Sequence, residues 1–216
     1  RLGGGDLNAL FGIAGFAGGI GFGTIFLKRG YSLERTYALS KLESAMMPAI
    51  QVGLLVLVVT APAFIFFSQK GPGAMHAPWL ISLAAGLVVG GLSQFSRLCT
   101  VGGFRDLFLF KKSILIFGYL AVLVGVFVVN ISFGNFHLGF ENQPVAHADG
   151  LWNFLGMALA GFCSVLLGGC PLRQLIMTGE GNSDSAVTVL GLAAGAAFAH
   201  NFGLAASGAG PTLNGQ

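Results

Sequence analysis

Residues 164–185 read SVLLGGCPLRQLIMTGEGNSDS, and this stretch decides how the chain is interpreted. It begins as the end of an apolar segment and continues with charged residues, and between the two stand Gly168, Gly169, Cys170 and Pro171. Backbone groups freed inside a bilayer must be satisfied by protein or by a water-lined cavity. The interruption therefore predicts a re-entrant or half-length helix that faces the protein interior. Proline suits the first position of a helix, where its missing N–H is not needed, so we expect that helix to begin at Pro171.

The composition is that of an integral membrane protein. Of the 216 residues, 54% are hydrophobic and 9% are charged, whereas soluble domains carry about 25% charged residues. Barrel strands need only about ten residues each, so the longer apolar segments predict an all-α membrane protein. Each is near the ~20 residues that cross a hydrocarbon core, and they span residues 9–27, 46–67, 77–96, 113–133, 151–167 and 186–202.

The basic residues are divided unequally when successive segments cross the membrane in alternate directions. One side receives nine and the other two, namely Lys28, Arg29, Arg35, Lys41, Arg97, Arg105, Lys111, Lys112 and Arg173 against Arg1 and Lys70. The richer side is expected in the cytoplasm. We therefore expect a multi-pass protein of the inner (plasma) membrane whose first segment runs from outside to inside.

Two distant parts of the chain resemble each other. Residues 1–23 align with residues 177–199, and the matches are Gly3, Gly5, Gly15, Ala17, Gly19 and Phe22 over Gly179, Gly181, Gly191, Ala193, Gly195 and Phe198. The charge distribution gives the two segments opposite orientations, which predicts an inverted repeat of the kind found in many transporters. A weaker echo precedes both Cys99 and Cys170, with glycine nine residues earlier and serine six residues earlier, although two helices rich in small residues would give the same pattern.

The expected organisation follows from this duplication. Residues 1–27 would be the last helix of a first repeat, 28–45 a cytoplasmic linker, and 46–216 the second repeat. The chain would then lack most of the first repeat. The counterpart of Cys170 would precede Arg1.

A second interruption, SRLCTVGGFRDL at residues 96–107, also places a cysteine beside glycines and charges. A helix that starts at Pro171 aims its positive dipole end at Cys170 and favours an anion there. A thiol is a soft, weak donor, so it can contact a sulfur- or selenium-bearing anion without trapping it, as conduction requires. The candidate substrate path consists of Cys99, Gly102, Arg105, Gly169, Cys170 and Arg173, with Arg173 as the preferred charged contact.

Other interpretations of the same residues stay open. A cysteine in a membrane helix is usually a small packing residue, and Cys163, in mid-segment, is interpreted in that way. Arg97 would anchor a helix end, Arg105 would pair with Asp106 or line the cytoplasmic mouth, and Glu180 would be solvated or cap the last helix. A structural or assembly subunit is one alternative function. A membrane thiol oxidoreductase with a reversible Cys163–Cys170 disulfide is another.

The stretches GGCPLRQLIMTGEGNSDSAVTVLG, SRLCTVGGFRDLFLF and GPGAMHAP resemble the YeeE/YedE family of sulfur transporters, and most closely its selenium-associated YedE branch. The resemblance implies an hourglass-shaped inverted repeat whose half-helices meet near the midplane. It also implies that Cys99 and Cys170 match two of the family cysteines that pass thiosulfate along by S–H contacts without covalent chemistry. A further family cysteine would lie in the missing first half.

The resemblance leaves the substrate open among thiosulfate, selenite, selenide and related anions. A small cytoplasmic sulfur carrier of the TusA type accompanies some members and is a candidate partner. The cysteine spacing gives no zinc site or disulfide framework, and neither a cofactor nor nucleic acid is expected. The chain encodes no ATP-binding module, so we expect no direct ATP coupling within it.

Overall fold

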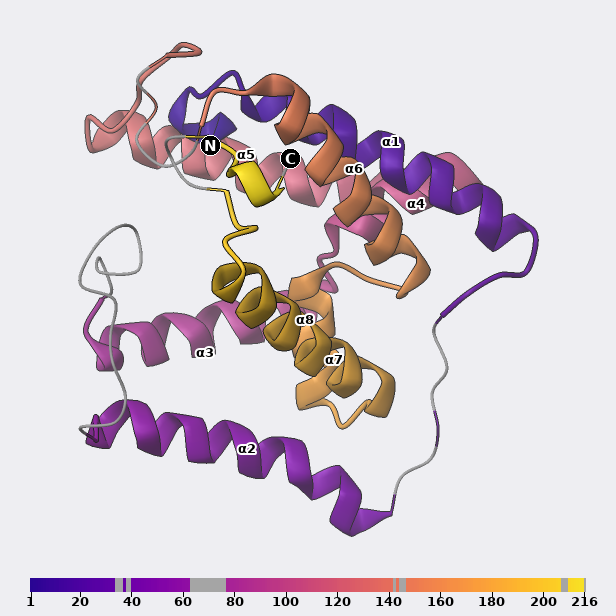
Figure 1. Cartoon of the computed structure of the whole chain (residues 1–216), viewed down its shortest axis with the longest axis vertical. Helices are drawn as coiled ribbons and strands as arrows, with labels where there is room; N and C mark the ends of the chain where they lie inside the picture. The colour runs from indigo at the N-terminus through magenta and orange to yellow at the C-terminus, as the bar shows by residue number, and fades with distance from the viewer. Residues whose placement is uncertain are drawn as a thin grey trace.

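The computed structural model describes residues 1–33, 37, 40–62, 77–141, 143, 147–206 and 210–215. Within these ranges the chain is helical and contains no strand (Figure 1). The elements are η1 (Leu2–Gly4), α1 (Ala9–Lys28), α2 (Lys41–Thr60), α3 (Trp79–Ser96), α4 (Thr100–Phe110), α5 (Ile114–Ser132), α6 (Gly150–Leu166), α7 (Pro171–Gly179), α8 (Ser183–Asn201) and η3 (Leu213–Gly215). Arg35, Lys70, the end of the predicted segment 46–67 and most of GPGAMHAP lie outside the described residues.

Five helical stretches of the described chain are long and apolar enough to cross a membrane. They are Ala9–Lys28, Lys41–Thr60, Trp79–Phe110, Ile114–Ser132 and Gly150–Gly179. This confirms the all-α membrane fold class. The sequence predicted six such segments. The sixth, at residues 186–202, forms helix α8 but is not apolar enough to count among these five. Asp184, His200 and Asn201 lie near its ends and lower its mean hydropathy.

Two of these stretches are broken where the sequence predicted a break. A straight helix over the 32 residues of Trp79–Phe110 would be about 48 Å long, which exceeds a hydrocarbon core of about 30 Å. The chain instead ends α3 at Ser96 and begins α4 at Thr100. In the same way α6 ends at Leu166 and α7 begins at Pro171, as predicted from the proline.

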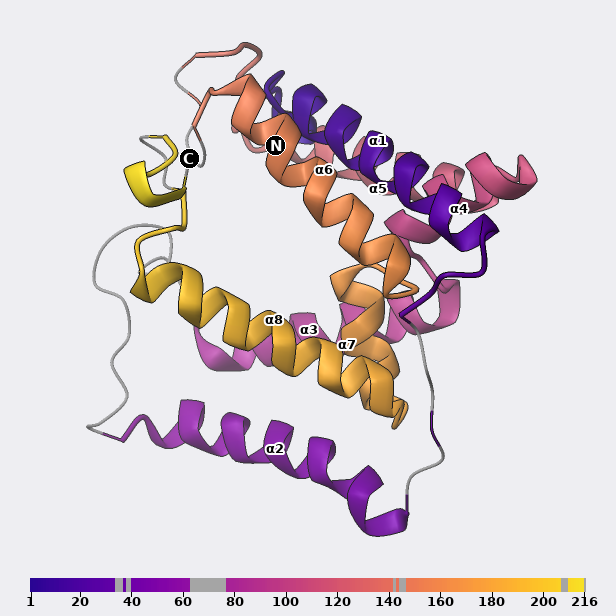
Figure 2. The same ribbon diagram turned by 45° about the vertical axis from the view of Figure 1, so that its right-hand side comes forward.

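Helices α1 and α6 lie side by side and run in the same direction (Figure 2). Glycine permits this approach, because a Cβ on Gly15 would overlap the Phe154 carbonyl oxygen and one on Gly19 would overlap that of Ala158. From the other side, a Cβ on Gly161 would overlap the carbonyl oxygen of Phe16. The backbones are therefore in direct contact, as small residues permit in membrane helices.

The loops gather at two ends of this helix pair. At one end the Leu7 N–H donates to the Gly139 carbonyl at 3.0 Å, and Arg1 donates to Asp6 at 2.5 Å. Burial opposes ionisation of Asp6, but hydrogen bonds from Arg1 and from the Asn8 N–H hold the pKa of its carboxyl below the ordinary value. These contacts tie the start of α1 to the loop before α6.

At the opposite end, contacts join the segment after α1 to the last helices. The Leu33 N–H donates to the Leu166 carbonyl at 3.1 Å, and the Ser183 hydroxyl donates to the Tyr37 carbonyl at 3.3 Å. These contacts tie the segment after α1 to the C-terminal end of α6 and to the start of α8.

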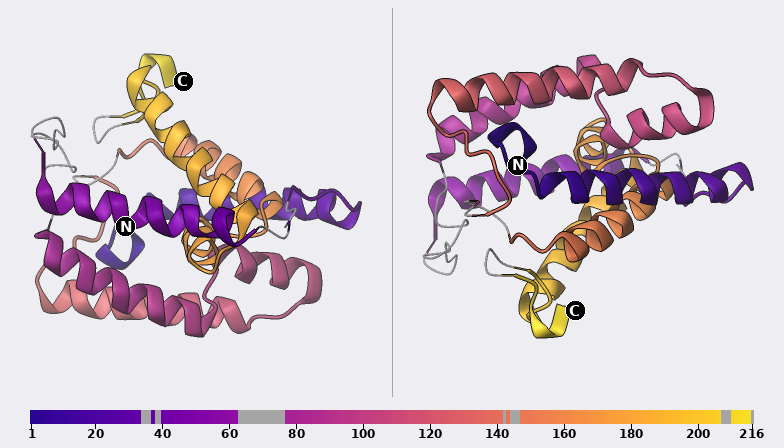
Figure 3. Two further views of the ribbon diagram at one scale, coloured as in Figure 1. Left: turned by 90° about the horizontal axis from the view of Figure 1, so that it is seen from below. Right: turned by 90° about the horizontal axis from the view of Figure 1, so that it is seen from above.

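The remaining helices surround this pair unevenly. Helices α4 and α5 form an antiparallel hairpin beside α1 (Figure 3, right). Helix α2 stands apart from the others in Figures 1 and 2, and it buries none of its described side chains. It begins at Lys41 with a capping box, in which Ser40 and Glu43 exchange backbone–side-chain hydrogen bonds. The end of the predicted linker 28–45 is thus the first turn of α2.

Candidate functional site

Arg97 and Cys99 define the break between α3 and α4. Arg97 adopts a left-handed conformation with φ 51°, which ends α3. Cys99 is extended and is the N-cap of α4, and its Sγ accepts a hydrogen bond from the Gly102 N–H at 3.3 Å. Gly102, predicted from the sequence as part of the path, thus contacts the thiol through its backbone. A Cβ at Gly102 would lie 3.2 Å from the Leu115 side chain.

The break between α6 and α7 repeats this backbone pattern. Gly168 is left-handed with φ 82°, one residue follows, and Cys170 is the extended N-cap of α7. The Gln174 N–H donates to the Cys170 carbonyl at 3.0 Å, which closes the first turn. In each break a left-handed residue stands two positions before a cysteine N-cap.

The fold brings the two cysteines together. The Cys170 N–H donates to the Cys99 Sγ at 3.5 Å, although 71 residues separate the two positions. The N–H groups of Arg173, Thr100 and Leu172 lie around the Cys170 sulfur. The N-terminal ends of α4 and α7 therefore meet at two thiols, and a helix N-terminus carries partial positive charge and unsatisfied N–H donors.

The thiols lie in an apolar cluster that excludes solvent. Cys99 is 8% exposed and Cys170 is 6% exposed. The other buried members are Ile20 of α1, Val101 of α4, and Val165 and Leu166 of α6. The polar N-terminal ends of two helices thus sit in low-dielectric surroundings, where electrostatic interactions are stronger than in water.

Arg173 lies one helical turn after Cys170. Its stem packs on Gly169, since a Cβ on that glycine would lie 3.3 Å from the Arg173 Cγ. Its guanidinium donates to the Gln94 Oε1 at 3.2 Å and lies 3.7 Å from a Glu180 carboxylate oxygen. Glu180, one of the residues with two interpretations, is therefore an ion-pair partner.

Arg105 occupies a different place. It pairs with the adjacent Asp106 at 3.0 Å, which agrees with one of its two interpretations. It lies six residues into α4 from Cys99, or about 9 Å along the helix axis. Among the described residues the Arg105 side chain contacts Asp106 and neither thiol. The fold therefore groups Cys99, Gly102, Gly169, Cys170 and Arg173, and Arg105 lies apart from them.

Cys163 is exposed on α6 beside an apolar hollow lined by Phe26, Phe162 and Leu166. It does not pack inside the chain, contrary to the packing role predicted for it. All three cysteines are free thiols. The structure brings Cys170 to Cys99, and not to Cys163 as the oxidoreductase hypothesis requires.

Sequence reasoning missed Gln174. It is 2% exposed, and its Nε2 donates at 2.8 Å to the carbonyl of Leu167, the C-cap residue of α6. Its Oε1 is buried and accepts no hydrogen bond from the described residues. Thr178, one turn later, is also buried and donates to the Gln174 carbonyl. The sequence signal that could have identified Gln174 is its spacing of four residues from Thr178, which places two polar side chains on one face of a short membrane helix.

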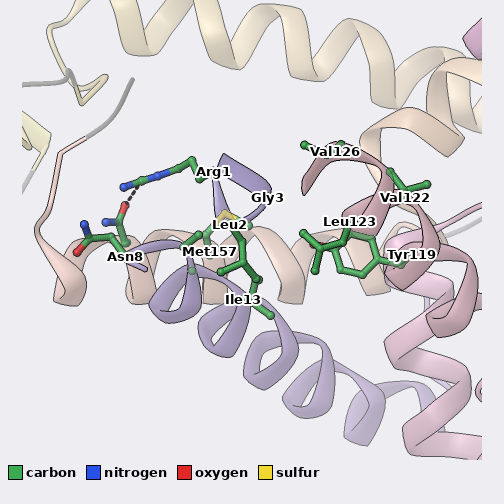
Figure 4. A pocket seen from close by; sticks show the side chains of 13 residues that line it. Arg1, Leu2, Gly3, Asn8, Ile13, Tyr119, Val122, Leu123, Val126 and Met157 are labelled. Carbon is green, nitrogen blue, oxygen red and sulfur yellow. Dashed lines mark hydrogen bonds between the residues drawn. The ribbon is translucent and has the colours of Figure 1, made fainter. Parts of the chain in front are cut away.

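A separate cavity of about 370 Å³ lies between η1, α1, α5 and α6 (Figure 4). Its wall is mainly apolar, with Ile13, Leu123 and Met157 among the labelled side chains and Arg1 at its rim. Neither cysteine of the two breaks lines it. The cavity is therefore separate from the paired thiols.

Comparison of the sequence with known protein families assigns the chain to one of them. The sequence profile of the sulphur transport family matches residues 95–210, which is more than half of the chain and includes both cysteine breaks. The chain belongs to this family. Membership confirms the resemblance at the level of the family and makes the chain a multi-pass membrane protein of a transporter family. The selenium-associated branch stays a prediction. No curated protein and no solved structure shows significant similarity to the chain.

Proposed function

We propose that the protein takes up a small sulfur- or selenium-containing anion along a central path between Cys99 and Cys170. The observation that carries this proposal is the meeting of two helix N-termini, each capped by a cysteine, inside the main buried cluster. A helix N-terminus favours an anion. Two helix N-termini that converge in a buried, low-dielectric environment favour an anion more strongly than one does.

The thiols suit a site through which an anion must pass. A lysine or arginine at the narrowest point would bind an anion tightly and release it slowly. A thiol is a weak donor, and it matches the soft sulfur or selenium atoms of thiosulfate or selenide. Conduction requires binding that is strong enough for the anion to arrive and weak enough for it to leave.

Arg173 supplies full positive charge close to the thiols without standing between them. It lies one turn into α7, with its stem on Gly169. We assign it the role of attracting the anion toward Cys170. Arg105, paired with Asp106, belongs at a mouth of the path rather than at the thiols.

The proposed transporter is an inverted repeat, with residues 1–27 ending the first repeat, 28–45 linking, and 46–216 forming the second. Local geometry supports the alignment. Gly5 and its counterpart Gly181 are both left-handed, with φ 95° and 86°. The next residues, Asp6 and Asn182, each accept a backbone hydrogen bond at the start of the following helix.

The inner membrane is the proposed location, with the basic loops in the cytoplasm. Thiosulfate is the first candidate substrate and selenite the second, and both rest on the family resemblance. A TusA-like carrier as acceptor on the cytoplasmic side rests on that resemblance alone.

Uptake of radiolabelled thiosulfate and selenite into cells that express the full-length gene tests the proposal. We compare wild type with Cys99→Ala and Cys170→Ala, and use Cys163→Ala as the matched control. A hydrogen bond to a charged group contributes about 1.5–3 kcal/mol, so each path variant should lose about 10- to 100-fold in uptake of the transported anion. The control should keep wild-type uptake, with equal membrane expression throughout. Uptake that survives both path substitutions would make the cysteines packing residues and favour a structural subunit.

A further inference from the structure

Three polar side chains from two helices and a loop form a closed ring beside the thiols. Arg173 of α7 donates to Gln94 of α3 and pairs with Glu180, the C-cap residue that follows α7. Gln94 in turn donates from its Nε2 to a Glu180 carboxylate oxygen. Each member therefore contacts the other two.

Within this ring the guanidinium of Arg173, the cation that we assign to the proposed path, already has a carboxylate partner. The Arg173 side chain is 22% exposed and that of Glu180 is 38% exposed, so both charges are partly shielded from water. Gln94 is exposed near the C-terminal end of α3, so the ring lies where an anion can reach it from outside the buried cluster. Within the described residues, no other carboxylate forms an ion pair with Arg173.

We propose that Glu180 is a specificity-determining residue that competes with the transported anion for Arg173, and that Gln94 holds the two in register. This inference rests on the proposed function. An arginine without a partner, beside two helix N-termini, would bind any small anion, including abundant chloride. With Glu180 in place, an anion gains Arg173 only by displacing a carboxylate. A divalent anion that also contacts the thiols can do so, whereas chloride cannot.

The same competition speeds release. When the anion moves on from Cys170, Glu180 returns to the guanidinium and lowers its hold on the anion. The ring therefore accounts for an arginine near the path that does not trap the substrate.

Glu180→Gln is the first test, since it keeps the shape and removes the charge. We expect the KM for thiosulfate, or for selenite if that is the transported anion, to fall about tenfold, and the maximal rate to fall because release slows. Chloride, which leaves wild-type uptake unchanged, should inhibit the variant. Asp184→Asn, a neighbouring acid outside the ring, is the matched control and should behave as wild type. An unchanged KM together with unchanged resistance to chloride would overturn the inference.

The charge-swapped double variant Arg173→Glu with Glu180→Arg separates competition from a merely structural ion pair. A structural pair would tolerate the exchange, and uptake would be retained. We expect normal membrane expression without uptake, because the cation no longer adjoins Cys170. Loss of uptake in Cys99→Ala and Cys170→Ala with normal kinetics in Glu180→Gln would overturn this inference alone. Retained uptake in both cysteine variants would overturn the proposed function instead.

Discussion

Gln174 has the largest fully buried polar side chain among the described residues, and it connects the two sides of the second break. Its amide donates to the carbonyl at the end of α6 while its backbone lies in the first turns of α7. That carbonyl has lost its own helical partner. The glutamine side chain therefore helps to fix where Cys170 stands.

Gln174→Glu should destabilise the protein by about 3 kcal/mol or more, because it buries an unpaired charge and removes the donor to the Leu167 carbonyl. Thermal unfolding in detergent measures the effect. Asn135→Asp makes the same amide-to-acid change at an exposed loop position outside the membrane helices and should be nearly neutral. Lowering the pH protonates the introduced carboxyl and restores a donor, so the defect should shrink under acid conditions. Equal effects at the two positions would show that Gln174 has no such role.

At this scale the sequence identified the cysteines and Arg173, but it did not identify Gln94 or Gln174. Cys99 and Cys170 are visible because glycines and charges interrupt apolar segments around them. Gln94 and Gln174 leave no comparable local mark. The Gln94 partner Glu180 lies 86 residues away, and only the packing of α3 against α7 brings them together.

Helix α1 shows how glycine spacing defines a helical face. Gly15, Gly19 and Gly23 recur every four residues and lie on one side of the helix, and all three are buried against α6. The abundance of glycine in the chain, 35 residues, is typical of closely packed membrane helices. It did not predict the partner, because a glycine face accepts any helix that presents its backbone.

Gly19→Ala should destabilise the fold by about 1–3 kcal/mol, the usual cost of overpacking, because the new methyl group would overlap the Ala158 carbonyl oxygen. Gly18→Ala is the control, since a Cβ at that exposed position meets nothing within 4 Å. It should be neutral, or stabilising by up to about 1 kcal/mol from helix propensity. Unfolding midpoints of the purified variants decide the matter. A stable Gly19→Ala protein would mean that α1 and α6 pack less closely than described.

On the scale of the whole molecule, the apolar outer surface agrees with a membrane setting. None of the residues of α5 is buried, and its exposed side chains include Phe117, Val124 and Val128. Helix α2 likewise exposes Val52 and Leu54. Such surface is expensive in water but is the normal lipid-facing surface of a membrane protein. Composition was enough to predict it, whereas the grouping of helices around the thiols needed the structure.

The orientation of the molecule is testable with introduced cysteines in a Cys163→Ser background, where the two remaining native thiols are buried. The charge division places the loop with Glu141 outside and the loop with Lys112 inside. Both positions are exposed. In right-side-out vesicles a membrane-impermeant maleimide should label Glu141→Cys at once, and Lys112→Cys only after permeabilisation. The reverse pattern would invert the molecule, and the basic loops would then face outward. Labelling of both in sealed vesicles would mean that the two loops share one side, which would contradict the alternate crossings on which the inverted repeat depends.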